Sequence, residues 1–369
     1  MTLADTVVLL GIPFLHYLWL KCDKYQNREA LGNMCADLCE LNTLKPNNCL
    51  PNHVGKDVVF EAIYFNDQVV VKSSKQNYDD FDQVFYVDSE GNKVHPNIDI
   101  FYSMISNTIQ TNLGITLKPT SNESLNLLTK LWTRNMLNFP HLPVSIQNIA
   151  MSNIWFLVQQ SEYLLMKYFE EVNIFPKVLG TCGFFYIVEF IQPLNNYFEI
   201  FYPSWQENFT KRASFALKII KFLEDTEKYF PLLHFCDIKV GHFGLDKTDN
   251  IKLLDMDMVF FEPSLIQNMV STESCSNNKD CSFLDCKGLC NVTSQKCEAK
   301  VLDNNFQRVC ENVFAGKLMP SYFGLLSSPP KTVSRELHIL LQRCSDTLDM
   351  KVISMINNEL KFLLTSVVK

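Results

Sequence analysis

The sequence lacks an excess of positive charge, which excludes one large class of partners. It has 33 Lys and Arg against 40 Asp and Glu, a formal net charge of −7 over 369 residues. It contains no basic patch with interleaved aromatic residues and no internal repeat. Because proteins bind nucleic-acid phosphates through a basic surface, we expect no nucleic-acid partner.

Long apolar runs are also scarce. The longest, Val7–Leu20, has 14 residues, and extending it back to Leu3 gives 18 with Asp5 inside the run. A membrane-spanning helix needs about 20 apolar residues. No basic segment precedes the run and no small-x-small cleavage site follows it, as a signal peptide requires. We predict a signal-anchor at residues 1–21, with a signal peptide or a buried N-terminal helix as alternatives.

The paired C-x-x-C units of zinc sites are missing, although the chain has 13 Cys. We therefore predict disulfides formed in an oxidising compartment. Asparagines in Asn-x-Ser/Thr sequences agree with a secretory glycoprotein: Asn122, Asn208 and Asn291. Because the number of cysteines is odd, at least one is unpaired or shared, and we predict a free thiol at Cys236.

Residues Leu232–Pro263 hold carboxylates whose spacing indicates a shared site. Asp237 begins a tight polar loop, and Asp255 and Asp257 follow alternating residues that predict a short half-buried strand. The loop, a hairpin and the strand end are expected to bring Asp237 and Asp255 into one pocket. Like charges repel unless a cation or a proton lies between them. A nucleotide-bound Mg²⁺ or Mn²⁺ fits this ligand set, and an acidic surface hairpin is the alternative.

A lysine ends an apolar strand in the N-terminal half. Residues 58–60, 62–65 and 69–72 predict strands, with a hairpin turn at Asn66–Asp67. An ammonium at Lys72 suits the α and β phosphates of a nucleotide. The alternative is a solvated lysine at a sheet edge.

Residues 152–169 predict one helix, and Glu162 lies on its apolar side. Two predicted strands follow, ending near Phe190. We expect Glu162 to pair with Lys72. Glu170 and Glu171 compete for this position, and a surface location is the alternative for Glu162.

Taken in order, these elements resemble a protein kinase. Residues 236–242 resemble the catalytic loop, and residues 255–257 resemble the D-F-G motif, with Asp255 18 positions after Asp237. Together with Gly180-Thr181-Cys182-Gly183 and the cysteines at both ends, residues 22–369 resemble the divergent protein kinase domain 1 family. Its members are cysteine-rich, kinase-like, single-pass proteins of the endoplasmic reticulum.

The resemblance implies an α+β, two-lobed protein-kinase-like fold with an N-lobe insertion and disulfide-rich additions. The expected parts, in chain order, are the apolar segment 1–21, a cysteine-rich segment 22–54, an N-lobe 55–192 with an insertion at about 73–150, and a C-lobe 193–369 with a cysteine module at 275–310. The implied location is the endoplasmic reticulum membrane, type II, with a lumenal kinase-like domain. A secreted protein is the alternative.

The resemblance also implies roles for individual residues. Asp237 would be the base for a hydroxyl acceptor on a protein or glycan, or would orient that hydroxyl, and Lys239 would steady the transferred phosphoryl group. Asp255 would hold Mg²⁺ or Mn²⁺ against ATP, and Lys72 with Glu162 would position its α and β phosphates.

Several positions depart from the kinase pattern. His242 replaces a metal-binding Asn and Asp257 replaces the Gly of D-F-G. Both are candidate metal ligands, and the alternative for Asp257 is that it only stiffens the loop. Phe235-Cys236 replaces His-Arg. Only Gly55 is available for the phosphate-binding loop, and no A-P-E sequence follows Asp257. Three functions therefore stay open: an active kinase, a pseudokinase that binds a nucleotide or partner, and a disulfide-stabilised secretory glycoprotein without a nucleotide site.

Overall fold

The computed structural model describes most of the chain in two compact units. The described residues are 22–41, 43–49, 58–73, 83–117, 121–132, 139–197, 209–270, 274–316, 324–347 and 349–368. Unit 1 comprises those up to Phe190 except Asn112–Gly114, and unit 2 comprises Asn112–Gly114 and those from Ile191 onward. The apolar segment 1–21, Gly55 and Asn208 lie outside the described residues, as do the side chains of Cys49 and Asn122.

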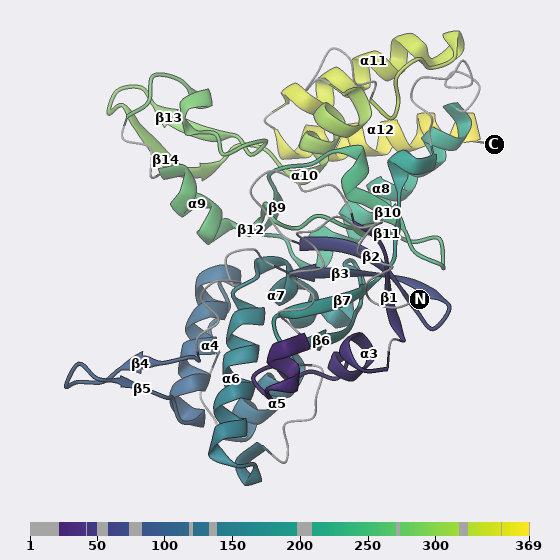
Figure 1. Ribbon diagram of the computed structural model, residues 1–369. Helices are drawn as coiled ribbons and strands as arrows, with labels where there is room; N and C mark the ends of the chain where they lie inside the picture. Colours follow the sequence, from purple (N-terminus) through teal and green to yellow (C-terminus); the bar gives the residue numbers. More distant parts are fainter. Residues whose placement is uncertain are drawn as a thin grey trace. The chain divides into compact units, whose positions relative to one another are not determined.

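Unit 1 is built on a five-stranded antiparallel sheet of order β1-β2-β3-β7-β6. Figure 1 shows β2, β3 and β7 side by side. The bounds are β1 Leu44–Cys49, β2 Val58–Tyr64, β3 Asp67–Ser73, β6 Val178–Cys182 and β7 Phe185–Glu189. Alternation along β3 buries Val69 and Val71 and leaves Lys72 on the opposite face.

Two details of the predicted hairpin are wrong. Residues 58–64 form one strand, because Glu61 takes an outward position in the alternation and bonds Gln68 across the hairpin at 3.1 Å. The turn lies at Phe65 and Asn66, since Tyr64 pairs with Asp67 and Phe65 adopts a positive φ of 54°.

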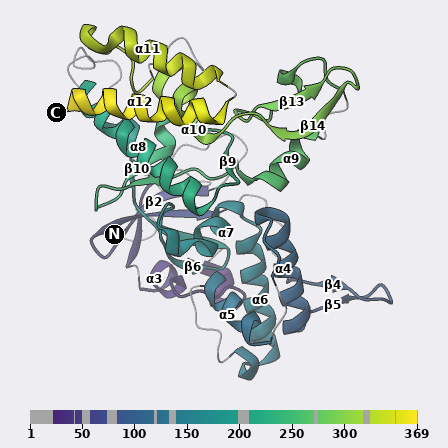
Figure 2. The same cartoon turned by 180° about the vertical axis from the view of Figure 1, so that it is seen from behind.

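Helices form the rest of unit 1, with a short hairpin that extends away from them in both views (Figure 1, Figure 2). The hairpin is β4 Tyr86–Val87 with β5 Lys93–Val94. The helices are α3 Cys35–Cys39, α4 Ile98–Leu113, α5 Ser121–Leu131, α6 Val144–Val158 and α7 Ser161–Tyr168, with single turns η2 Phe139–His141 and η3 Glu170–Val172.

The single helix predicted for residues 152–169 is wrong, because the chain breaks between α6 and α7. Gln160 has extended backbone angles (φ −84°, ψ 105°). Its side chain donates to the Phe184 carbonyl at 3.0 Å, which stabilises the break. Glu162 consequently lies in the first turn of a new helix.

The N-terminal cysteine-rich segment is attached to strand β6. Cys35 is bonded to Cys182, and Met34 N–H donates to the Thr181 carbonyl at 3.1 Å. A Cβ on Gly32 would lie 2.0 Å from the Thr181 carbonyl oxygen, so the close approach requires glycine.

Unit 2 combines helices with short strands. Helix α12 packs against α8 on one side and against α11 on the other (Figure 2). The helices are α8 Phe209–Tyr229, α9 Glu262–Val270, α10 Asn305–Arg308, α11 Lys331–Asp346 and α12 Met350–Val368, with turns η4 Leu194–Tyr197, η6 Val240–His242 and η7 Asn278–Cys281 and a π-helical stretch η8 Val309–Ala315. One sheet has the order β11-β10-β8, and β12 pairs with β9 and β13 with β14. The strands are β8 Gln192–Pro193, β9 Leu233–Phe235, β10 Phe243–Leu245, β11 Ile251–Leu253, β12 Val259–Phe261, β13 Gly288–Asn291 and β14 Lys296–Val301.

Twelve of the cysteines form disulfides, which confirms the predicted disulfide framework. The six bonds are Cys22–Cys39, Cys35–Cys182, Cys236–Cys286, Cys275–Cys290, Cys281–Cys297 and Cys310–Cys344. The prediction of a free thiol at Cys236 is wrong. Its partner, Cys286, lies 50 residues away in the sequence, and both side chains are fully buried.

We expect the disulfide that attaches the N-terminal segment to contribute more stability than its neighbour. Cys35→Ala/Cys182→Ala removes a link between residues 147 apart and is predicted to lower the free energy of unfolding by about 4–5 kcal/mol. Cys22→Ala/Cys39→Ala, with a separation of 17, should cost only about 3 kcal/mol. Chemical denaturation of the oxidised proteins measures both values, and equal losses would contradict the prediction.

Candidate active site

In unit 1, the lysine of strand β3 forms a buried ion pair with helix α7. Lys72 Nζ contacts Glu162 Oε1, and the two side chains are 14% and 7% exposed. Tyr186, opposite Lys72 in the β3–β7 register, donates its hydroxyl to Glu162 Oε2 at 2.8 Å. The first turn of a helix also favours a carboxylate. Each oxygen of Glu162 thus has a partner, and the carboxylate holds the Lys72 ammonium in place.

The competing glutamates have other environments. Glu170 pairs with Lys167 at 2.6 Å, and Glu171 is exposed. The pairing of Glu162 with Lys72 is therefore present as the sequence indicates. The roles of the pair toward a nucleotide stay predictions. Tyr186 was not anticipated, because its position opposite Lys72 depends on the register of two strands distant in sequence.

In unit 2, local hydrogen bonds bring the loop after β9 next to the end of β11. Strands β10 and β11 form a hairpin, and Asp246 accepts from backbone N–H groups in its turn. At the other end, Leu254 N–H donates to the His242 carbonyl at 2.8 Å. The next residue, Asp255, therefore lies beside the His242 ring.

Asp237, His242 and Asp255 converge, each offering a ligand atom within 4.8 Å of the others. His242 Nε2 lies 3.3 Å from Asp255 Oδ2, and Lys239 Nζ lies 3.3 Å from Asp237 Oδ2. The Asp237 and Asp255 side chains are 40% and 44% exposed, so a ligand can reach them from solvent. Asp257 donates its backbone N–H to Asp255 Oδ1 at 3.3 Å and lies outside the converging group.

The His242 ring lies between two hydrogen-bond acceptors. Its Nδ1 is 3.1 Å from the Asp237 carbonyl oxygen, and its Nε2 faces the Asp255 carboxylate. Burial lowers the pKa of His242 against the opposing charge of Asp255 and so favours the neutral ring. A neutral imidazole has one N–H, and its other nitrogen then points a lone pair at an acceptor.

A bound cation would resolve this conflict. If Nδ1–H donates to the Asp237 carbonyl, His242 Nε2 and the Asp255 carboxylate would both be available to hold a cation. The residues present therefore fit a divalent metal. One imidazole nitrogen and carboxylate oxygens suit Mn²⁺ better than Mg²⁺, because Mg²⁺ prefers an all-oxygen shell.

Comparison with protein families identifies the chain. A family model described as the protein-kinase domain of FAM69 matches residues 154–347, more than half of the sequence. The chain belongs to the FAM69 family. A second model, described as the N-terminal cysteine-rich ER segment of FAM69, matches residues 17–128. The predicted divergent protein kinase domain 1 family and the kinase-like fold with disulfide-rich additions are thereby confirmed.

Membership in FAM69 makes this chain a divergent kinase-like protein of a cysteine-rich, ER-associated family. Glu162 and the converging group of unit 2 lie within the kinase-domain match, and Lys72 lies within the cysteine-rich match. None of the helices in the described part of this FAM69 chain is both long and apolar enough to cross a membrane.

Breaking the buried pair of unit 1 should destabilise the protein. Glu162→Ala leaves the Lys72 charge without its carboxylate and is predicted to cost roughly 2–3 kcal/mol, somewhat below the ~3–5 kcal/mol of fully buried pairs because Lys72 keeps some exposure. Lys72→Met/Glu162→Leu should recover most of the loss. Urea denaturation measures both, with Glu171→Ala as the exposed control. An equal loss of stability in Lys72→Met/Glu162→Leu and in Glu162→Ala would contradict the claim that the unpaired Lys72 charge causes the destabilisation.

The metal assignment predicts that His242 contributes directly to Mn²⁺ affinity. His242→Ala is expected to weaken Mn²⁺ binding about 10-fold or more, measured by isothermal titration calorimetry, because one coordination bond is removed. His338→Ala, an exposed histidine on α11, is the control and should leave the affinity unchanged. Unaltered affinity in His242→Ala would exclude the imidazole as a ligand.

Proposed function

We propose that this FAM69 protein transfers a phosphoryl group from ATP, with Mn²⁺ or Mg²⁺, to a hydroxyl group of a protein or glycan in the secretory pathway. The observation that carries the proposal is the convergence of Asp237, His242 and Asp255 on one point of unit 2. Two carboxylates and a neutral imidazole provide both a metal site and a candidate base within one loop and hairpin.

His242 and Asp255 are the proposed metal ligands. When bound, the metal neutralises charge on the phosphate oxygens of the nucleotide. The backbone N–H of Asp257 donates to Asp255 Oδ1 and so orients the carboxylate. The role of the Asp257 side chain as a further ligand remains an expectation of the sequence.

Asp237 is the proposed base, and Lys239 its electrostatic partner. The Asp237 carboxylate is partly exposed, as contact with an acceptor hydroxyl requires. Its oxygen Oδ2 lies 3.3 Å from the Lys239 ammonium, which is also well placed to attract the negative charge of a transferred phosphoryl group.

In unit 1, Lys72 is the proposed ligand of the α and β phosphates, and Glu162 with Tyr186 holds its ammonium in one position. A fixed ammonium needs less reorganisation when charge develops on the phosphates. Gly55 would supply a backbone N–H to the phosphates in this proposal.

The compartment proposed is the lumen of the endoplasmic reticulum, with residues 1–21 as a type II membrane anchor and a secreted form as the alternative. Six disulfides support an oxidising compartment. Asn291, in one of the predicted glycosylation sequences, is partly exposed beside the exposed Val292.

Nucleotide binding without transfer is the second candidate. The observation that favours it is His242, which takes the place of an oxygen ligand in the kinase pattern. If the metal is displaced, the nucleotide can still bind, but its phosphoryl group is no longer aligned with the acceptor. Transfer is therefore lost more easily than binding, because transfer depends on geometry.

The full chain should show metal-dependent ATP binding and transfer. We expect ATP to raise the melting temperature only with Mn²⁺ or Mg²⁺, and Asp255→Asn to abolish the shift. Asp237→Asn should keep the shift and lower autophosphorylation by about 10²–10⁴-fold. Asp225→Asn, in an exposed pair with Lys221, is the control.

The alternatives give different results in this experiment. A shift without transfer in the wild type would identify a pseudokinase. If ATP does not change the melting temperature with either metal, the protein is a disulfide-stabilised secretory glycoprotein without a nucleotide site.

A further inference from the structure

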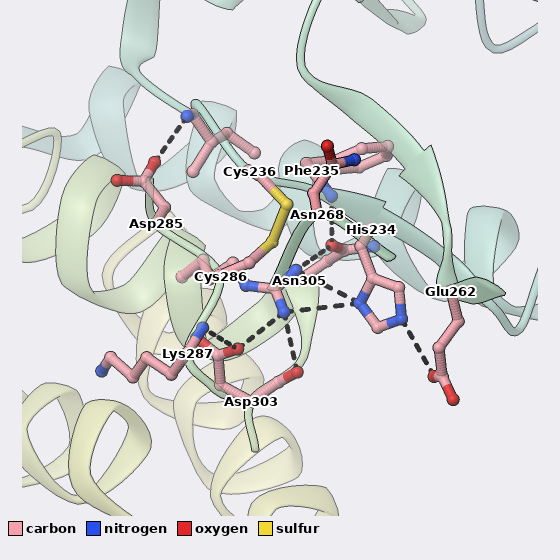
Figure 3. Close-up of a disulfide and its surroundings, with 12 residues drawn as sticks. His234, Phe235, Cys236, Glu262, Asn268, Asp285, Cys286, Lys287, Asp303 and Asn305 are labelled. Carbon is pink, nitrogen blue, oxygen red and sulfur yellow. Dashed lines mark hydrogen bonds and ion pairs between the residues drawn. A yellow bond between two sulfur atoms is a disulfide. The ribbon is translucent and has the colours of Figure 1, made fainter. Parts of the chain in front are cut away.

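The loop that carries Asp237 is attached to the cysteine module on both sides of this residue. Cys236 is bonded to Cys286, and Asp285 N–H donates to the Cys236 carbonyl at 2.8 Å. Ile238 N–H donates to Asp285 Oδ2, also at 2.8 Å. Figure 3 shows the Asp285 carboxylate pointing at this backbone nitrogen, next to the disulfide.

These contacts begin where strand pairing ends. Val259 in β12 pairs with Phe235 in β9, and Cys236 N–H donates to the Met258 carbonyl at 2.9 Å. Beyond this point Asp285 replaces a neighbouring strand as the hydrogen-bond partner of the loop. The direction of the backbone at Asp237 therefore depends on the cysteine module.

The disulfide is a permanent link rather than an exchangeable one. Cys236 and Cys286 are fully buried in an apolar cluster with Leu265 and Met269. A thiolate must reach a sulfur atom to break the bond, and burial prevents this in the folded protein.

Hydrogen-bond donors around Asp285 partly offset the cost of burying its carboxyl group. Burial raises the pKa of Asp285 and the Asp237 charge raises it further, whereas the Ile238 N–H, the Asn312 side chain and the Arg308 charge oppose this rise. Donors thus face the carboxylate from the loop and from η8.

A second set of contacts fixes strand β9, which leads into the loop. Asn305 accepts from Phe235 N–H at 2.9 Å and donates to the Leu233 carbonyl at 2.7 Å. Arg308 pairs with Asp303 at 2.6 Å. Asp303 also accepts from Lys287 N–H at 3.0 Å (Figure 3). The module and β9 are therefore held together next to the Cys236–Cys286 bond.

We propose that Asp285 and the Cys236–Cys286 disulfide are positioning groups for Asp237, and that they lock the catalytic loop covalently. In kinases an arginine before the catalytic Asp couples this loop to a phosphorylated activation segment. Here that position is Cys236, and its disulfide keeps the loop in one arrangement without phosphorylation. The inference rests on the proposed phosphoryl transfer.

Asp285→Ala and Asp285→Asn form a matched pair that tests it. Asp285→Ala should accelerate hydrogen exchange at the Ile238 amide at least 10-fold, because the acceptor is removed. It should lower kcat of phosphoryl transfer about 10-fold and leave KM for ATP unchanged. Asp285→Asn retains an amide oxygen that accepts from Ile238 and should restore protection and most of kcat.

A pair of disulfide variants adds a second test. Cys236→Ala/Cys286→Ala should lower kcat, whereas Cys22→Ala/Cys39→Ala, which removes a disulfide of the N-terminal segment and none of the module, should leave it near the wild-type value. If the Cys236→Ala/Cys286→Ala protein does not fold, the comparison of Asp285→Ala with Asp285→Asn still tests the positioning role.

The outcomes separate this inference from the proposed function. An Asp285→Ala protein with unchanged kcat, whether or not Ile238 exchange accelerates, would overturn the positioning role. Absence of transfer in the wild type would instead refute the proposed function. In that case the hydrogen exchange of Ile238 alone would test the attachment of the loop, and an unchanged rate in Asp285→Ala would overturn it.

Discussion

The position of the His242 ring between two acceptors is the constraint on which the candidate site depends. A neutral ring satisfies the Asp237 carbonyl or the Asp255 carboxylate with a proton, but not both. A divalent cation at Nε2 would satisfy both neighbours at once. The same ring links the loop after β9 to the end of β11, so one side chain sets the position of the proposed metal ligand Asp255 relative to the proposed base Asp237.

Disulfides support this arrangement from outside the site. The cysteine module is too short to form an apolar core, and covalent links compensate for that deficit. Two of its bonds, Cys275–Cys290 and Cys281–Cys297, hold the module together. A third, Cys236–Cys286, connects it to the loop of Asp237. In the proposed mechanism, the module takes the place of the interactions that kinases obtain from an activation segment.

Unit 1 retains a conventional kinase feature within a divergent sequence. The helix predicted for this region is broken at Gln160, but the Lys72–Glu162 pair is still formed. The break places Glu162 in the first turn of α7, where it contacts Lys72. Tyr186 completes the carboxylate's hydrogen bonding from the adjacent strand. A FAM69 protein therefore keeps its lysine fixed through contacts from a strand, a helix and a neighbouring strand.

The sequence by itself determined the features that arise from short spacings. The alternation of apolar and polar residues placed Lys72 on its strand. Asp237 and Asp255 are only 18 positions apart, and a loop and a hairpin over this distance predicted that they meet, because few conformations connect such near neighbours. Tertiary structure decided the rest. It decided three pairings between residues far apart in the chain: Cys236 with Cys286, Asp285 with Ile238, and Tyr186 opposite Lys72. Local propensity carries no information about such pairings, since many cysteine connectivities and strand registers satisfy the same sequence pattern.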